Sequence, residues 1–365
     1  MTCTFRKGSR TMHPRVWLIA ICAALACAMT CEAGLLPRRS ELRRTNRKLH
    51  GTIIDHTHNH GADRRIWSEA LHEKRDLYVY LPPCFDCTKC YPIMVWLHGF
   101  AQDETSFLEE VIVPIDRAIA QGKLPPVILA APDGTIDGKS HLVVTFNRGS
   151  FYINNKAGAF EDYIIQDVWG FLLANYPILP QREFHVLAGA SMGGGGAYNL
   201  GIKYRDQFGI VVGFFPPLNT RWVNCHGRYR SKFDPCCWGW RTDFRRREVV
   251  ARFVGIPIRL KLMIAPIFEL HDHDRTIEDI SRENPIEMLD RLDVREGDLS
   301  MWVGYGGRDQ FYMDAQIESF LYRAREKGLT VTVGYLPRGK HNKRTAYKLL
   351  PGLLDWLRPQ LPDVR

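Results

Sequence analysis

The 365-residue sequence lacks the features of a nucleic-acid-binding protein, because it has neither a long basic tail nor a nucleic-acid-binding motif. Its formal net charge of +9 is a mild basic excess. Part of that excess lies in the first 33 residues, which carry Arg6, Lys7, Arg10 and Arg15 against the single acid Glu32. We interpret the charge as a surface property and expect no nucleic-acid partner.

The sequence also lacks an apolar run long enough to span a bilayer comfortably. The longest N-terminal run, Val16–Ala26, follows the basic residues, and the small residues Cys31 and Ala33 precede Gly34. This pattern predicts a signal peptide over residues 1–33, with an uncleaved anchor as the alternative. We therefore expect an exported protein (periplasmic, secreted or on the cell surface), with no stable membrane insertion after cleavage and a single domain over residues 34–365.

Removal of the leader would leave six of the ten cysteines: Cys84, Cys87, Cys90, Cys225, Cys236 and Cys237. An even number in an oxidising compartment favours disulfides, although the sequence does not fix which of the 15 pairings forms. The spacing Cys84-x-x-Cys87-x-x-Cys90 could instead bind a metal, but the sequence has no second cluster with ligand spacing. We predict disulfides and no metal.

Two histidine-rich stretches leave similar alternatives open. The segment Gly51–His60 alternates like a strand, which would place His56, His58 and His60 on one face. That face could chelate a metal, but an exposed face of an edge strand is the favoured interpretation. For His271-Asp-His-Asp274, an exposed polar turn is likewise favoured over a metal site.

The segment Phe184–Ala197 organises the chain. An apolar run ends in Gly189-Ala190-Ser191-Met192-Gly193, and a small-residue, helix-compatible segment follows. This is the strand, sharp turn and helix of a nucleophile elbow, G-x-S-x-G. The glycines two residues before and after the serine are needed because a Cβ there would collide with the neighbouring strand or helix. The pattern predicts Ser191 as a nucleophile, whereas a plain glycine-rich turn is the alternative.

Strand-like and helix-like segments alternate along the rest of the chain. This alternation predicts an α/β-hydrolase fold, with a mostly parallel central sheet and helices on both faces. Ligands of such sheets bind at the carboxyl ends of the strands. The expected strands are a hairpin within Ile66–Leu81 with Arg75–Leu81 as its second strand, then Tyr91–Leu97, Pro126–Ala131, Phe184–Ala188, Phe208–Phe215, Gly297–Gly304 and Leu329–Leu336. The expected helices are Phe107–Ala120, Glu161–Tyr176, the segment after Ser191, Ala315–Lys327 and Tyr347–Leu357.

A serine nucleophile needs a base and an orienting acid, which follow it in the order acid, then histidine, on this fold. Asp309 lies on a glycine-rich loop after one expected strand, and His341 lies on the loop after the next. Asp314 and Asp298 are substitutes for the acid, but the first falls in an expected helix and the second precedes a strand. The backbone N–H groups of Met192 and Phe100 are the expected oxyanion hole.

The ordered motifs Leu81-Pro82-Pro83, Tyr91–Gly99, Pro132-Asp133-Gly134, Phe151–Asn154, Gly189–Gly193, Gly304–Asp309 and Gly339–His341 resemble those of the esterase D-like "Putative esterase" family. That family includes feruloyl esterases, acetyl xylan esterases, S-formylglutathione hydrolases and mycolyltransferases. The resemblance implies Ser191, Asp309 and His341 as the triad. It also implies that the Asn147–Asn154 stretch borders the substrate pocket, with Tyr152 and Asn154 as substrate-binding residues.

Two departures from the family pattern stand out. Cys84 replaces the usual glycine after Leu-Pro-Pro, which we interpret as a local disulfide graft. The stretch from about residue 216 to 282 is an insertion near the active-site face, rich in tryptophan, arginine and cysteine. It could form a lid or substrate platform suited to sugar rings, aryl groups or anionic polymers, or be a disulfide-pinned, solvated excursion.

The sequence therefore predicts an exported serine carboxylic-ester hydrolase that needs no cofactor and acts on small-molecule or polysaccharide esters, removing acyl or feruloyl groups. Export disfavours S-formylglutathione, a cytosolic substrate. The alternatives are an acyltransferase with the same triad, a peptidase, and a non-catalytic carbohydrate-binding protein.

Overall fold

The computed structural model describes residues 39–138, 148–244, 247–253, 256–268 and 273–364. The predicted signal peptide, Asn147 and the pair His271-Asp272 lie outside the described residues. Among those residues, no helix combines the length and apolar character needed to cross a membrane.

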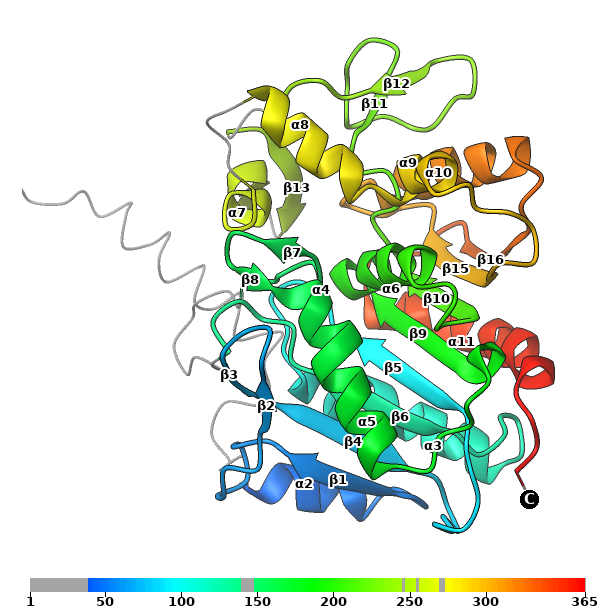
Figure 1. The fold of residues 1–365 in the computed structure, drawn as a ribbon. Helices are drawn as coiled ribbons and strands as arrows, with labels where there is room; N and C mark the ends of the chain where they lie inside the picture. Colours follow the sequence, from blue (N-terminus) through cyan, green and yellow to red (C-terminus); the bar gives the residue numbers. More distant parts are fainter. Residues whose placement is uncertain (1–38, 139–147, 245–246, 254–255, 269–272, 365) are drawn as a thin grey trace, which may run out of the picture.

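Eight strands form one central sheet (Figure 1). Strand β4 runs antiparallel to both of its neighbours, and every other neighbouring pair is parallel. In spatial order the strands are β1 (Thr52–His56), β4 (Leu77–Leu81), β6 (Ile128–Pro132), β5 (Ile93–Leu97), β9 (His185–Ala190), β10 (Ile210–Phe214), β15 (Ser300–Gly306) and β16 (Val331–Leu336). The predicted mostly parallel sheet is confirmed.

Helices cover both faces of this sheet, because its inner strands are apolar on both sides. Each residue of β6 and β10 is buried, for example. Figure 1 shows α5 and α6 on the near face and α3 and α11 on the far face. The helices are α2 (Arg39–Asn46), α3 (Ile112–Ala120), α4 (Phe160–Asp162), α5 (Trp169–Asn175), α6 (Met192–Lys203), α7 (Leu260–Ile264), α8 (His273–Arg282), α9 (Pro285–Arg291), α10 (Met313–Glu326) and α11 (Lys343–Leu357).

Shorter elements connect these parts. A π-helical segment precedes α3 (Phe107–Val111), and another joins α4 to α5 (Tyr163–Val168), so the helices predicted over Phe107–Ala120 and Glu161–Tyr176 are both present. Single-turn 3-10 helices cover Arg182–Phe184 and Arg358–Gln360. The two-stranded hairpins are β2 (Ile66–Ser68) with β3 (Glu73–Arg75), β7 (Asn154–Asn155) with β8 (Gly158–Ala159), β11 (Trp222–Asn224) with β12 (Trp238–Trp240), and β13 (Val249–Phe253) with β14 (Ile256–Arg259).

The hairpin predicted over Ile66–Leu81 is correct only in its first part. Strand β2 pairs with β3, but the chain then leaves the hairpin and enters the central sheet as β4, between β1 and β6. The break occurs at Asp76, whose buried carboxylate accepts a hydrogen bond from the backbone N–H of His58 at 2.8 Å. Asp76, which is hydrogen-bonded to His58, thus separates β3 from β4, although the sequence predicts one continuous strand over both.

The side chains of the three histidines in Gly51–His60 do not lie on one face of a strand. Strand β1 is an edge strand, as predicted, but it ends at His56, and the chain turns where the N–H of Thr57 donates to the carboxylate of Asp55 at 3.0 Å. The imidazoles then have separate partners: His56 contacts the Tyr176 hydroxyl, His58 the Asp76 carboxylate and His60 the Tyr78 hydroxyl, at 2.7 to 2.9 Å. The three imidazoles therefore do not converge on one point, and His58 is exposed whereas His56 and His60 are half-buried.

Among the described cysteines the structure forms one disulfide, between Cys225 and Cys237. Cys84, Cys87, Cys90 and Cys236 are free and exposed. The interpretation of Cys84 as a local disulfide graft is therefore wrong. Its backbone has φ +56°, in the left-handed region that favours glycine, which explains why a glycine would suit this position.

The inserted stretch packs as a small unit with its own apolar cluster. Trp222, Tyr229, Val250 and Leu260 of this stretch are buried together with Ala315 of α10. Hairpin β11–β12, which the disulfide closes, lies above the sheet near α9 and α10 in Figure 1. The stretch thus packs over one end of the sheet through this cluster, while the loop that the disulfide closes is largely exposed.

Candidate active site

Ser191 lies in a strained turn between β9 and α6. Its backbone has φ 55° and ψ −121°, a combination that side-chain-bearing residues adopt only where the surroundings enforce it. Its N–H donates to the carbonyl of Phe214 at 2.7 Å, which ties the turn to the end of β10. A Cβ at Gly189 would lie 2.4 Å from the backbone of Gly193, and one at Gly193 would lie 1.9 Å from the Leu97 carbonyl oxygen. The glycines on both sides are therefore required by packing.

Asp309 and His341 meet at the ends of the next strands. The Nδ1 atom of His341 lies 2.8 Å from Oδ2 of Asp309, and the carboxylate is completely buried. The other carboxylate oxygen accepts the N–H of Phe311 at 2.8 Å. This arrangement fixes the tautomer of the histidine, with a proton on Nδ1 and a lone pair on Nε2.

The two loops that carry this pair are joined by backbone hydrogen bonds. The N–H of Gly307 donates to Leu336 at 3.0 Å, and that of Arg308 donates to Gly339 at 2.9 Å. A Cβ at Gly306 would overlap the backbone of Gly339, at 2.4 Å. The close approach of these glycines holds the acid and the histidine in one position.

Aromatic rings link His341 to the serine turn. The imidazole lies against the rings of Phe215 and Phe311, with centroids 4.9 and 4.8 Å apart. Phe215 directly follows Phe214, the residue that accepts the hydrogen bond from Ser191. Ser191, Asp309 and His341 thus follow the carboxyl ends of β9, β15 and β16, all at the same end of the sheet. Phe215 follows β10, the strand between β9 and β15.

The expected oxyanion donors lie beside Ser191. Met192 is the first residue of α6, and the loop after β5 passes close enough that a Cβ on Gly99 would lie 3.6 Å from the serine Cβ. The N–H of Gly99 donates to the side chain of Gln102 at 3.0 Å. In contrast, the N–H groups of Met192 and Phe100 donate to no acceptor among the described residues.

A buried polar network holds the loop that carries Phe100. The ring of His98 contacts the Gly99 carbonyl through Nδ1 at 2.9 Å and accepts the N–H of Gly134 at Nε2 at 2.8 Å. Asp133 lies beside this ring and pairs with the fully buried Arg75 at 3.0 Å. Burial would raise the pKa of Asp133, but the charge of Arg75 lowers it to about 2. The loop is therefore anchored by a buried ion pair.

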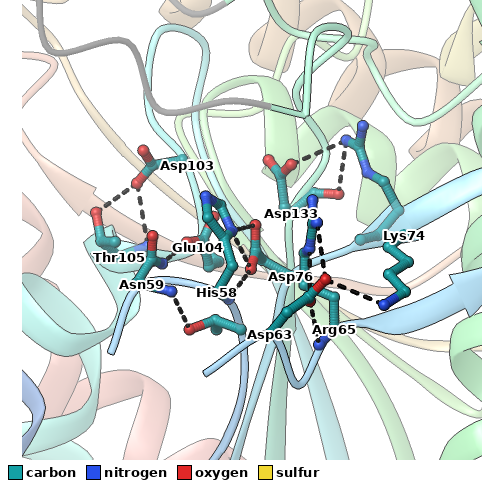
Figure 2. Close-up of polar contacts among 12 residues, drawn as sticks. His58, Asn59, Asp63, Arg65, Lys74, Asp76, Asp103, Glu104, Thr105 and Asp133 are labelled. Atoms are coloured by element: carbon teal, nitrogen blue, oxygen red, sulfur yellow. Dashed lines mark hydrogen bonds and ion pairs between the residues drawn. The ribbon is translucent and has the colours of Figure 1, made fainter. Parts of the chain in front are cut away.

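Further buried carboxylates lie beside this network (Figure 2). The His58 ring contacts Asp76 at 2.9 Å, and the amide of Asn59 donates to Glu104 at 2.6 Å. Burial, together with the negative charges of Asp103, Asp133 and Asp76, raises the pKa of Glu104 well above its usual value. The sequence analysis did not identify this network, although histidine and acidic residues directly after apolar strands were a signal for it.

The two residues predicted to bind substrate have contacts within the protein. Tyr152 is completely buried, and its hydroxyl donates to the His98 carbonyl at 3.1 Å. Asn154 accepts the N–H groups of Glu161 and Asp162 at 3.0 and 3.2 Å, at the start of α4. Tyr152 has no surface that a substrate could contact, so that prediction is corrected, and neither residue is carried into the proposed substrate site.

The sheet, the serine turn and the carboxylate–histidine pair are together those of an α/β-hydrolase. A family model described as "Putative esterase" matches residues 68–348. The chain therefore belongs to the Putative esterase family and is an esterase-family hydrolase.

Comparison with solved structures supports the same fold. A ferulic acid esterase is 19% identical, with a TM-score of 0.60 over 86% of this chain and 99% of that one. An S-formylglutathione hydrolase from Agrobacterium tumefaciens is 14% identical, with a TM-score of 0.57 over 86% and 97%. A ferulic acid esterase from Anaeromyces mucronatus, in complex with ferulic acid, is 17% identical, with a TM-score of 0.50 over 84% and 91%. At these identities the likeness shows the shared fold.

Proposed function

We propose that the protein is an exported serine esterase in which Ser191 is the nucleophile, His341 the general base and acid, and Asp309 the orienting acid. The N–H groups of Met192 and Phe100 form the oxyanion hole. These groups supply nucleophile, base and charge stabilisation, so the proposed reaction requires no cofactor.

The proposed reaction has two stages. Nε2 of His341 takes the Ser191 proton while the serine oxygen attacks the ester carbonyl, and the negative oxygen is stabilised by the two N–H groups. The imidazolium then gives its proton to the departing alcohol, which leaves an acyl-enzyme. His341 next activates a water that releases the acid, and Asp309 stays ionised throughout.

The observation that carries the proposal is the 2.8 Å contact between Asp309 and His341, together with the strained Ser191 turn, all after the carboxyl ends of strands in one parallel part of the sheet. A buried carboxylate on Nδ1 has a clear chemical use, because it stabilises the imidazolium that forms during attack. A carbohydrate-binding protein would have no need for this pair.

The proposed substrates are acyl or feruloyl esters of carbohydrates or other small alcohols. Two of the similar structures carry the name ferulic acid esterase, which supports this class. Export is supported by the leader-like first 33 residues and is consistent with the Cys225–Cys237 disulfide. Secreted protein whose N-terminus begins at Gly34 would support export, whereas intact leader on protein retained in the cytosol would contradict it.

A fluorophosphonate probe tests the assignment of the nucleophile. We expect wild type to gain one covalent label and Ser191→Ala to gain none, with ester hydrolysis reduced by at least about 1,000-fold. Ser300→Ala is the matched control, because Ser300 is exposed at the opposite end of a strand. Equal labelling of the Ser191→Ala variant, or an unlabelled wild type, would refute the assignment.

A further inference from the structure

Part of the inserted stretch contacts the loop that carries Asp309. That loop, Gly307–Tyr312 (the acid loop), connects β15 to α10. The contacting segment, Tyr229–Lys232, lies between β11 and β12, within the part of the chain that the Cys225–Cys237 disulfide closes. Residues 82 positions apart in the sequence thus meet beside the orienting acid.

The first contact is a hydrogen bond to Phe311. The Tyr229 hydroxyl donates to the Phe311 carbonyl at 2.6 Å. Phe311 is also the residue whose N–H donates to the Asp309 carboxylate at 2.8 Å and whose ring contacts His341, with centroids 4.8 Å apart. Because these three contacts share one residue, a displacement of the Phe311 backbone reaches both members of the carboxylate–histidine pair.

The same hydrogen bond stabilises a strained part of the acid loop. The Phe311 carbonyl belongs to the peptide that precedes Tyr312, and Tyr312 has φ 59°, in the left-handed region. A residue with a side chain keeps this conformation only where its surroundings enforce it. Arg230 supports it as well, because its guanidinium donates to the Tyr312 hydroxyl at 3.4 Å. The insertion therefore contacts the acid loop where the backbone is strained.

A second contact lies at the opposite end of the acid loop. The Lys232 ammonium donates to the Gly307 carbonyl at 2.8 Å, two residues before Asp309. It also pairs with Asp314, a buried residue in the first turn of α10. Asp309 thus lies between two residues, Gly307 and Phe311, whose backbone carbonyls accept hydrogen bonds from the insertion.

Tyr229 is itself fixed in one position. It is only 7% exposed, and the guanidinium of Arg241 lies over its ring, 4.9 Å from the centroid. The Gln316 amide nitrogen donates to its hydroxyl at 3.1 Å, and the Trp222 indole N–H donates to its carbonyl at 3.0 Å. Burial raises the pKa of Tyr229, so the hydroxyl keeps its proton. It is therefore a fixed donor to the acid loop.

We propose that Tyr229 and Lys232 are positioning residues through which the insertion keeps Asp309 against His341. The proposal rests on the function proposed above and gives the insertion a part in it. The carboxylate is useful only where it faces Nδ1, because it must fix the tautomer and stabilise the imidazolium. A misplacement of about 1 Å can cost about 100-fold in rate, so loosening the acid loop should lower kcat.

Tyr229→Phe tests the proposal, because it removes one hydroxyl and keeps the ring. With the full protein and p-nitrophenyl acetate, we expect kcat to fall at least about tenfold and KM to change by less than about twofold, since Asp309 acts on the transition state and not on substrate binding. Tyr198→Phe is the matched control. Its hydroxyl is also buried but has no hydrogen-bond partner among the described residues, so kcat should stay at the wild-type value.

Two variants of Lys232 test the other end of the acid loop independently. Lys232→Met removes the donor to the Gly307 carbonyl and should lower kcat at least about threefold with little change in KM. Lys232→Arg keeps a positive charge and N–H donors and should restore most of the loss. Equal kcat values in Lys232→Met and wild type would contradict a positioning role for this residue.

A proton NMR spectrum adds a readout that a merely structural role would not change. The proton on Nδ1 of His341, hydrogen-bonded to Asp309, should give a far-downfield resonance, and its loss in Asp309→Asn assigns it. In Tyr229→Phe the resonance should move upfield or broaden through exchange with water. In Tyr198→Phe it should stay as in wild type.

The possible failures are distinguishable. A Tyr229→Phe protein that is folded by urea unfolding, with wild-type kcat and an unchanged resonance, would overturn the positioning role and leave the esterase proposal standing. A raised KM with unchanged kcat would also overturn it, because Tyr229 would then act on substrate binding. Wild-type protein that neither hydrolyses p-nitrophenyl acetate nor shows the resonance would overturn the proposed function as well. If Tyr229→Phe does not fold, the two Lys232 variants decide.

Discussion

Two regions next to the candidate site bury polar groups in different ways. Beneath the oxyanion loop, carboxylates are held by a guanidinium, imidazoles and amides, as in the Arg75–Asp133 and Asn59–Glu104 pairs. In the insertion, by contrast, apolar side chains such as Phe244, Val250 and Leu260 line a hollow against α6 and α10. The first arrangement holds a backbone position through ion pairs and hydrogen bonds, and the second holds the insertion in place through apolar contacts. The two regions are thus stabilised by different interactions.

The largest expected effect is on the free energy of unfolding, and it compares the packing of the serine turn with that of the insertion. Gly193→Ala should lower the free energy of unfolding by more than about 3 kcal/mol, because its Cβ would overlap the Leu97 carbonyl. Gly239→Ala, in β12 of the insertion, meets no atom within 4 Å and should change stability by less than about 1 kcal/mol. Urea unfolding of the two variants measures the difference, and similar losses would mean that the two regions are packed alike.

An intermediate effect is expected from the disulfide that closes the insertion. Cys225→Ser should cost about 2–3 kcal/mol, because the bond closes a loop with a sequence separation of 12 residues. Local opening should be confined to the exposed part of the insertion next to this bond, so p-nitrophenyl acetate turnover should stay nearly unchanged. Urea unfolding measures the loss of stability, and turnover is measured on the same samples.

Cys236→Ser provides the control, since Cys236 is adjacent in sequence but free and exposed. A loss of p-nitrophenyl acetate turnover in the Cys225→Ser variant would show instead that the disulfide supports the catalytic loops.

The smallest expected effect concerns the pH dependence of the network. Because the folded-state pKa of Glu104 is raised, its contribution to stability is complete below its unfolded pKa of about 4.5 and is lost as the pH rises through the folded value. Glu104→Gln cannot ionise, so its stability relative to wild type should increase from pH 5 to pH 8. Thermal unfolding at a series of pH values measures this trend.

Glu278→Gln, at an exposed position on α8, controls for the exchange of a glutamate for an amide. If the stability difference between Glu104→Gln and wild type instead stays constant with pH, that result would show that folding does not raise the pKa of Glu104.

The sequence predicted the scaffold better than the surface that surrounds it. Strand order along the chain, the serine turn and the alternation of strands and helices follow from local patterns of apolar residues and glycines, and the structure confirms them. The hairpin expected over Ile66–Leu81 failed because Asp76 breaks it, through a hydrogen bond to a residue 18 positions away. The histidine run failed for a similar reason, since each imidazole found a different distant partner.

By itself, the sequence determined the fold class and the elbow around Ser191, because close packing at Gly189 and Gly193 leaves few other residues possible. It also placed Asp309 and His341 on the loops after β15 and β16. Only the tertiary structure decided that Tyr152 is buried, that Cys225 pairs with Cys237, and that the insertion encloses a cavity. Local propensity acts over a few residues, whereas burial, cysteine pairing and cavities depend on which distant segments come into contact.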